Sequence, residues 1–276
     1  MGKQNEDFTV IKANALLENR VKFKLVELKL TLAVIAQIKR EDDEFKDYQV
    51  HIQDFQELTN RDGDMHTYAK NVCIGLRAKT IVIPMGKGKN LVTGYFSDIE
   101  IHEKGQIVFS ISPKMRPYLL QLRKNFTVYD IRNVLNCRSV YSIRLYQLLK
   151  QYEGIGKRTM SLDELKHILG FESGQYTRWG NFKTRIIEVA RKELKKSSDL
   201  YFEYETEKKH RVVHSITFTI LKQRQKRLFD GEDFIRNDEP IKRLKATEQY
   251  LKRQEEQDKE SEPAPKEIKE RLNLNA

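Results

Sequence analysis

The chain has few of the residues that disulfide-bonded, secreted or membrane-spanning proteins require. Its 276 residues include two cysteines, Cys73 and Cys137, too few and too far apart for a disulfide framework. The longest apolar run, residues 30–38, is shorter than the roughly 20 residues that a helix needs to cross a bilayer. The first residues, MGKQNEDFTVIK, contain no apolar segment of signal-peptide length. We therefore expect a cytoplasmic protein.

Motifs for catalysis are also missing. Residues 85–90, MGKGKN, have the glycines and lysines of a phosphate-binding loop but neither its spacing nor its Ser or Thr, so they predict a flexible basic loop. A GxSxG motif is absent, as is the His-hydrophobic-His pair that a rolling-circle nickase needs beside its tyrosine nucleophile. His210 and His214 are four residues apart on an expected strand, with no third ligand in view. The sequence predicts no enzyme, no catalytic residue, no metal site and no cofactor.

Charge is what the chain has in excess. Lys and Arg number 51 against 40 Asp and Glu, which gives a net charge of +11 and a pI of about 9.4. A surplus of this size attracts polyanions such as nucleic acids, provided that it is gathered in patches. Hydrophobic residues make up 39% of the chain and the mean hydropathy is -0.67. These values predict two domains of ordinary size, each with a small core.

The order of apolar patterns predicts the same unit twice. In each unit a segment with helical spacing is followed by a strand, two further helices and a pair of strands in which apolar and polar residues alternate. In the first unit these are a helical region at 12–39, a strand at 48–52, a helix capped by Asp54 with Glu57, a helix at 66–80, a Gly- and Lys-rich connection at 81–94, and a hairpin around HEKG at 102–105.

The second unit follows the same order. Its short helix has Ser161 as N-cap and Glu164 at the capping-box position, and its hairpin turns around EKKH at 207–210. When the units are laid 110 residues apart, Val72 falls on Phe182 and Leu76 falls on Ile186. Helix-turn-helix plus β-hairpin is a winged helix, so we expect an α+β protein with two tandem winged-helix domains. The expected domains are residues 1–125 and 126–222, followed by a charged, disordered tail at 223–276.

The helix expected over 178–200 combines an apolar stripe with a basic face. Phe182, Ile186, Val189, Ala190 and Leu194 recur at helical spacing and should face the core. A basic helix followed by a basic hairpin is typical of a DNA-binding surface, in which Arg and Asn read base edges and Lys binds phosphate. The candidate residues on the helix and wing are Arg178, Asn181, Lys183, Thr184, Arg185, Glu188, Arg191, Lys192, Lys195, Lys208, Lys209 and Arg211, and those in the first unit are Lys70, Asn71 and Arg77.

Three segments carry a resemblance to a known family. They are SVYSIRLYQLLKQY at 139–152, RTMSLDELKHILGF at 158–171 and YTRWGNFKTRIIEVARKELKKSSDLYFEYE at 176–205. Together they resemble the Rep_3-type, iteron-binding plasmid replication initiators, densely over 139–220 and more loosely over 12–115. The resemblance implies two winged-helix domains in a pseudo-twofold relation, of which the second reads bases and the first holds the DNA backbone or forms a dimer.

The resemblance also implies a function and partners. Such initiators bind directly repeated double-stranded origin DNA, the iterons, promote origin opening and recruit host initiator or helicase-loading proteins. A monomer–homodimer equilibrium and repression of the initiator's own gene belong to the same pattern. The base-reading candidates that it implies are Arg178, Asn181, Thr184 and Arg185. Two alternatives are open: a winged-helix transcriptional repressor without origin function, and a rolling-circle nicking initiator.

Overall fold

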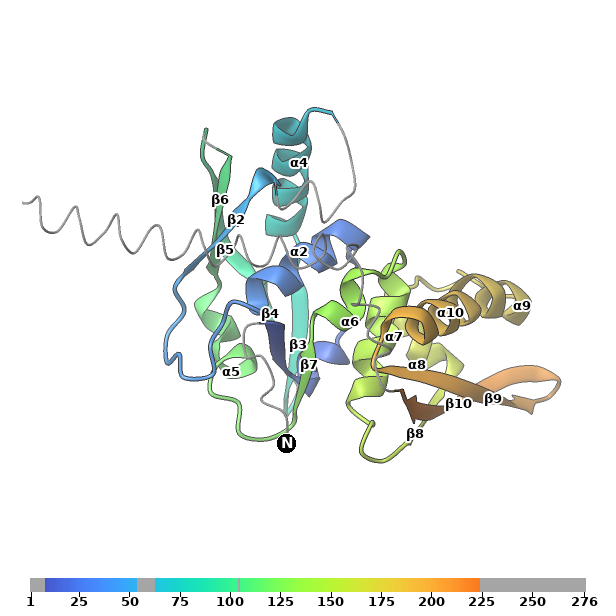
Figure 1. Ribbon diagram of the computed structural model, residues 1–276. Helices are drawn as coiled ribbons and strands as arrows, with labels where there is room; N and C mark the ends of the chain where they lie inside the picture. The colour runs from blue at the N-terminus through green and yellow to red at the C-terminus, as the bar shows by residue number, and fades with distance from the viewer. Residues whose placement is uncertain (1–7, 54–62, 104, 224–276) are drawn as a thin grey trace, which may run out of the picture.

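The computed structural model describes residues 8–53, 63–103 and 105–223. The helix cap expected at Asp54 and Glu57 and nearly all of the expected tail lie outside the described residues. Two lobes lie next to each other, with the helices α6 (Arg132–Leu135) and α7 (Val140–Lys150) between them (Figure 1). This mixed α/β arrangement confirms the expected pair of winged-helix units.

The first lobe contains short helices and three small antiparallel sheets. Its sheets have the strand orders β2-β6-β5, β3-β4 and β1-β7, and α4 lies beside the first of them. The elements in chain order are β1 (Thr9–Ala13), α1 (Asn14–Leu17), α2 (Leu25–Ile35), β2 (Asp47–His51), α4 (Met65–Arg77), β3 (Ile81–Gly86), β4 (Lys89–Thr93), β5 (Phe96–Ile101), β6 (Gln106–Ile111), the 3-10 turn η2 (Pro113–Met115), α5 (Arg116–Leu119) and β7 (Phe126–Asp130).

Two expectations for this lobe are wrong. The helical region expected at 12–39 begins as strand β1, which pairs with β7 more than 110 residues later, and only α1 and α2 within it are helical. The connection expected at 81–94 is a hairpin in which Ile81 and Ile83 are fully buried. The glycines that give the segment the composition of a loop form its turn, where Gly86, Lys87 and Gly88 all have positive φ angles.

The second lobe is a single winged helix. Its sheet has the order β8-β10-β9, and α8 and the following helix pack against it. Glu164 donates its backbone N–H to the hydroxyl of Ser161 at 3.1 Å, which confirms the predicted N-cap of α8. The elements are β8 (Lys157–Ser161), α8 (Leu162–Ile168), α9 (Trp179–Phe182), a π turn η3 (Lys183–Ile187), α10 (Glu188–Ser197), β9 (Leu200–Lys209) and β10 (Val212–Lys222).

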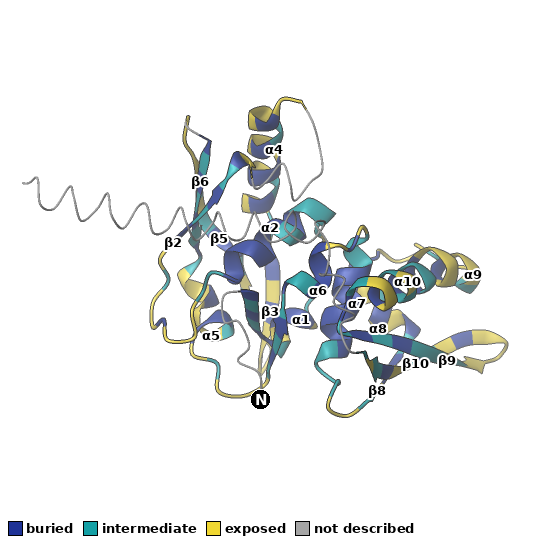
Figure 2. Ribbon diagram, viewed as in Figure 1, coloured by how far each residue is buried: buried dark blue, intermediate teal, exposed yellow. Residues whose placement is uncertain are grey.

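Helix α7 is buried on every side between the lobes. All of its residues from Ser142 to Leu149 are buried, and Figure 2 shows it dark blue along its length. A helix buried all round belongs to the centre of a fold rather than to its surface. The buried apolar residues of both lobes accordingly form one continuous cluster.

Residues 17–22, which we call the strap, fasten the two lobes together. The buried guanidinium of Arg144 in α7 donates to the carbonyl oxygens of Leu17 and Asn19 at 2.9 and 2.8 Å. Three ion pairs of the strap also join the lobes: Arg158 with Glu18, and both Arg20 and Lys22 with Glu172. The Asn19 side chain donates to the carbonyl oxygen of Val82 in β3, which fixes the strap to the first lobe. A charged side chain that bonds to several carbonyls is costly to strip of its partners, so the lobes should keep one relative position.

Candidate nucleic-acid interface

The helical segment from α9 through α10 turns its apolar side to the core by means of a π turn. Phe182, Ile186, Ala190 and Leu194 are buried and spaced strictly four apart. On an uninterrupted α-helix each such step rotates the side chain by about 40°, so the four would not share one face. The wider π turn at 183–187 absorbs this drift and also buries Ile187. The opposite side is left free for polar residues.

Acidic side chains on this segment are engaged by neighbours. Glu188 accepts a hydrogen bond from the Tyr204 hydroxyl at 2.6 Å and pairs with Arg191 at 3.5 Å, and Arg191 also pairs with Glu203 in β9. The hydrogen bond from Tyr204, aided by Arg191, lowers the pKa of Glu188 and keeps it ionised. Glu188 and Arg191, expected on the exposed face, are half-buried and link the helix to the wing.

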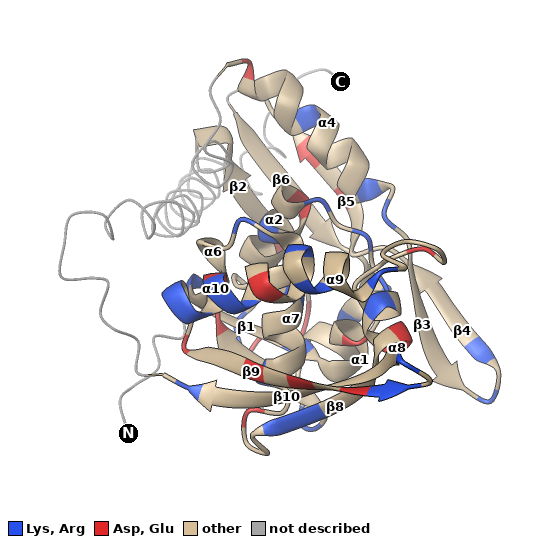
Figure 3. Ribbon diagram, turned by 90° about the vertical axis from the view of Figure 1, so that its right-hand side faces the viewer, with Lys and Arg blue, Asp and Glu red and all other residues tan. Residues whose placement is uncertain are grey.

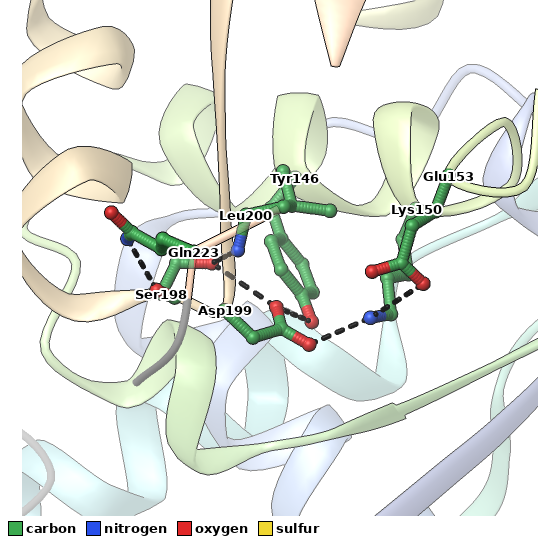
Figure 4. A network of polar contacts seen from close by, with 7 residues as sticks. All are labelled: Tyr146, Lys150, Glu153, Ser198, Asp199, Leu200 and Gln223. Carbon is green, nitrogen blue, oxygen red and sulfur yellow. Dashed lines mark hydrogen bonds and ion pairs between the residues drawn. The ribbon is translucent and has the colours of Figure 1, made fainter. Parts of the chain in front are cut away.

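The far end of the helix is fixed to α7 at two points. The carboxylate of Glu193 accepts the backbone N–H groups of Arg138 and Ser139, just ahead of α7. Beyond the helix, Asp199 accepts hydrogen bonds from the Tyr146 hydroxyl at 3.0 Å and from Lys150 at 2.6 Å (Figure 4). The Gln223 side chain also donates to the carbonyl of Ser198 (Figure 4). These contacts orient the exposed side rigidly with respect to the rest of the protein.

The exposed side of the segment is left with a net positive charge. Within the described residues, no ion pair joins its exposed basic side chains to an acid, so their charge is available to a ligand. Figure 3 shows blue bands on the part of the segment that follows α9, in η3 and α10. The exposed predicted residues are Arg178, Asn181, Lys183, Thr184, Arg185, Lys192 and Lys195, of which Lys195 lies over the ring of Tyr201.

The β9–β10 wing ends in a basic tip. Lys208, Lys209 and Arg211 are all exposed there, as predicted. His210 and Arg211 form a two-residue turn with φ angles of 48° and 66°, the left-handed geometry that matches the twist of a hairpin. The expectation that His210 and His214 share one strand is wrong, because His210 lies in this turn. Among the described residues no group of His, Cys, Asp and Glu is arranged to hold a metal ion.

In the first lobe the corresponding helix is α4, and its outer face is partly apolar. Lys70, Asn71 and Arg77 are exposed on it, as predicted. Ile74 lies between them in the helix with 58% of its surface exposed. It borders an open groove of about 540 Å³ that also involves Ile99 and Ile101 of β5. Of the predicted residues, two basic ones are exposed on α4, against five from Arg178 through α10.

Sequence reasoning missed the strap and the β3–β4 hairpin. After Leu17, the last residue of α1, the strap has no regular structure, and its partners are up to 152 residues away, so no local pattern reveals it. For the hairpin a signal was present, since a β-branched run at residues 81–83 and a second apolar pair, Leu91 and Val92, stand on either side of GKG. Both cysteines are buried as free thiols, and burial raises the pKa of each to about 12.

The comparisons with known proteins agree with this geometry. The family described as "Initiator Replication protein, WH1" matches residues 9–150, and "Initiator Rep protein, WH2" matches residues 161–220. The chain belongs to the Rep3 family of initiator replication proteins. Comparison with curated proteins gave no match.

One solved structure shares the fold of this chain over most of the chain's length. It is the crystal structure of Pi initiator protein in complex with iteron DNA, with a TM-score of 0.65 and 18% sequence identity. The similarity covers 80% of this chain and 100% of the other. None of the helices within the described residues of this initiator is long and apolar enough to cross a membrane.

Proposed function

We propose that the protein initiates plasmid replication by binding directly repeated sequences, the iterons, in double-stranded origin DNA. One observation carries this proposal: the exposed side of α9–α10 is basic, whereas its acids Glu188 and Glu193 are bonded inside the protein. An α-helix fits the major groove of B-DNA, and a cationic face with fixed orientation is what phosphate and base-edge contacts require. Family membership and the likeness to Pi initiator support the same function.

The exposed residues divide by chemistry into two roles. Arg178, Asn181, Thr184 and Arg185 lie in the first turns, where a recognition helix meets base edges, and Arg and Asn match guanine and adenine edges in fork geometry. Lysines bind phosphate and supply affinity that depends on salt but not on sequence. We assign this second role to Lys183, Lys192, Lys195, Lys208, Lys209 and Arg211. Glu188 and Arg191 act through position, by holding the helix against the wing.

The domain roles follow the family pattern. The second lobe, from β8 to β10, is the base-reading domain, and the first lobe supports it by backbone contacts through Lys70, Asn71 and Arg77 or by pairing with a second copy. Origin opening, recruitment of host helicase-loading proteins and repression of its own gene complete the proposal. Each of these activities requires binding alone, so this chain cleaves no bond of the DNA.

Fluorescence anisotropy on two duplexes tests the proposal. One duplex is taken from DNA beside the protein's own gene and chosen for direct repeats, and the other carries the same bases scrambled. Strong preference for the repeats, together with a steep salt slope, supports a site-specific initiator. A steep slope with equal affinity for both duplexes contradicts it, because phosphate binding alone gives no preference. A site-specific nick with tyrosine attached to the DNA, in the presence of Mg²⁺, would contradict the non-enzymatic part.

A further inference from the structure

The β3–β4 hairpin is the one strongly exposed apolar and basic projection that the proposed function leaves unused within the described residues. Met85, Val92 and Val82 have 62%, 63% and 46% of their surface exposed. Pro84 is exposed too, and so are the tip residues Lys87 and Lys89. A cluster of large exposed apolar side chains on a monomer marks a binding surface. What it binds is decided by its charge and its position.

The charge of the hairpin points to a polyanion. Residues 81–94, IVIPMGKGKNLVTG, contain two lysines and no acidic residue. The tip is also narrow, because Gly86 and Gly88 flank Lys87 and all three take positive φ angles. Lysines on a slim tip suit phosphates on the two sides of a groove, and apolar residues such as Met and Pro are those that proteins place in the minor groove.

Position supports the same ligand. In Figure 3 the tips of β3–β4 and of β9–β10 point to the right-hand side, to which the α9 end of the recognition segment also lies nearest. Figure 1 shows the two hairpins separated along the length of the molecule. A duplex laid along that side would meet the recognition segment and both hairpins at successive points.

The strap sets where the hairpin stands with respect to the second lobe. The Asn19 side chain donates to the carbonyl oxygen of Val82 at 2.6 Å, and the Asn19 carbonyl accepts from Arg144 at 2.8 Å. Arg20 and Lys22 hold Glu172, in the loop that precedes α9. The hairpin is thus tied through Asn19 to α7 and, along the same strap, to Glu172 ahead of the recognition segment, so it can act with that segment as one surface.

We infer that the β3–β4 hairpin is a second DNA-binding wing, in which Lys87 and Lys89 bind phosphates while Pro84 and Met85 lie in the minor groove beside the sequence read by α9–α10. The inference rests on the proposed function, since it needs a specific complex. It adds a contact that the base-reading residues do not make, and it predicts an effect on affinity and footprint without loss of sequence preference.

The lysines are tested by the salt dependence of binding to repeat DNA. For Lys87→Ala/Lys89→Ala we expect the slope of log K against log salt to fall by about 2, because each phosphate contact contributes about 0.9. The control Lys114→Ala/Lys124→Ala removes two exposed lysines near α5, on another side of the first lobe, and should leave the slope unchanged. Preference for repeat over scrambled duplex should stay as in the unaltered protein. Equal slopes for both double variants would overturn the inference.

Met85 is tested by methylation with dimethyl sulfate, which attacks guanine N7 in the major groove and adenine N3 in the minor groove. We expect the protein to protect guanines within the repeat and adenines beside it, and Met85→Ala to lose the adenine protection alone. Ile155→Ala, at a position 73% exposed in the second lobe, is the apolar control. Unchanged adenine protection in Met85→Ala would overturn the minor-groove contact, as would a loss of self-association in this variant without any change in DNA binding.

Measuring Arg185→Ala beside the hairpin variants distinguishes failure of the proposed function from failure of the second wing alone. If the unaltered protein shows no preference for repeats, the proposed function fails and the hairpin has no specific complex to join. If preference is present and Arg185→Ala abolishes it while the hairpin variants behave as their controls do, only the second wing is refuted.

Discussion

The Tyr204 hydroxyl in β9 donates a hydrogen bond of 2.6 Å to the Glu188 carboxylate in α10. This bond joins the wing to the recognition helix at the point where the helix leaves its π turn. It also occupies a carboxylate that would otherwise face DNA among lysines and arginines. A single contact therefore contributes both to the stability of the lobe and to the charge of its binding face.

Replacing Tyr204 with Phe should weaken both properties. Loss of a hydrogen bond to a half-buried carboxylate is expected to lower the free energy of unfolding by about 1 kcal/mol. Freed Glu188 should also repel phosphate, so affinity for repeat and scrambled DNA should fall together. Urea denaturation and anisotropy measure the two effects. Tyr201→Phe is the matched control, since Tyr201 lies on the same strand and contacts Lys195 through its ring; equal behaviour of the two variants would refute the role of the bond.

Arg185→Ala should reduce sequence preference. A lost bidentate contact to a base is expected to cost about 1–3 kcal/mol on repeat DNA and far less on scrambled DNA. Lys195→Ala should instead weaken binding to both duplexes alike and make the salt slope shallower by about 1. Titration of both duplexes at two salt concentrations distinguishes these cases. An equal loss on both duplexes for Arg185→Ala would show that Arg185 binds phosphate.

Elements with a local signal were predictable. The N-cap of α8 follows from Ser161 and Glu164, three residues apart, and the long hairpin follows from alternation of Leu200 and Phe202 with polar residues. The basic face of the recognition helix was found in the same way, since Phe182 and Leu194 mark its buried side. These features depend on neighbours within a few positions along the chain.

Features that depend on distant partners were not predictable. Strand β1 exists because it pairs with β7, and nothing near residues 9–13 specifies that partner. The half-burial of Glu188 and Arg191 depends on Tyr204 and Glu203, which arrive on the next strand. A helical wheel places both residues on the exposed face, because it does not include contacts between the helix and the wing.

Asp199→Ala should destabilise the second lobe more than its partial exposure suggests. The substitution leaves the buried Tyr146 hydroxyl without its acceptor and removes one of the two acids that pair with Lys150. An unsatisfied buried group and a weakened ion pair are together expected to cost about 2 kcal/mol. Denaturation of Asp199→Ala beside Asp98→Ala, an exposed aspartate on β5, measures the difference. A cost no larger than that of the control would show that Asp199 is dispensable.

Lys12 gives a pH dependence of stability with a definite sign. It is buried beside Arg144, its amine donates to the Tyr95 hydroxyl at 3.1 Å, and burial lowers its pKa from 10.5 to about 7. Between those two pH values the unfolded chain binds more protons at this site than the folded one, so stability should rise with pH across that window. Below pH 7 both states are protonated and the full cost of burying the charge is present.

Lys12→Met should remove this dependence. The variant is expected to have a flatter slope of unfolding free energy between pH 7 and pH 10 than the unaltered protein, and to gain most relative to it near pH 7. Tyr95 does not disturb the comparison, because burial raises its pKa to about 12. Urea denaturation at several pH values provides the slopes, with Lys114→Met as the exposed control. If Lys12→Met and the unaltered protein change in parallel, Lys12 keeps its charge in the folded state, and a counter-charge must reach the space between β1 and α7.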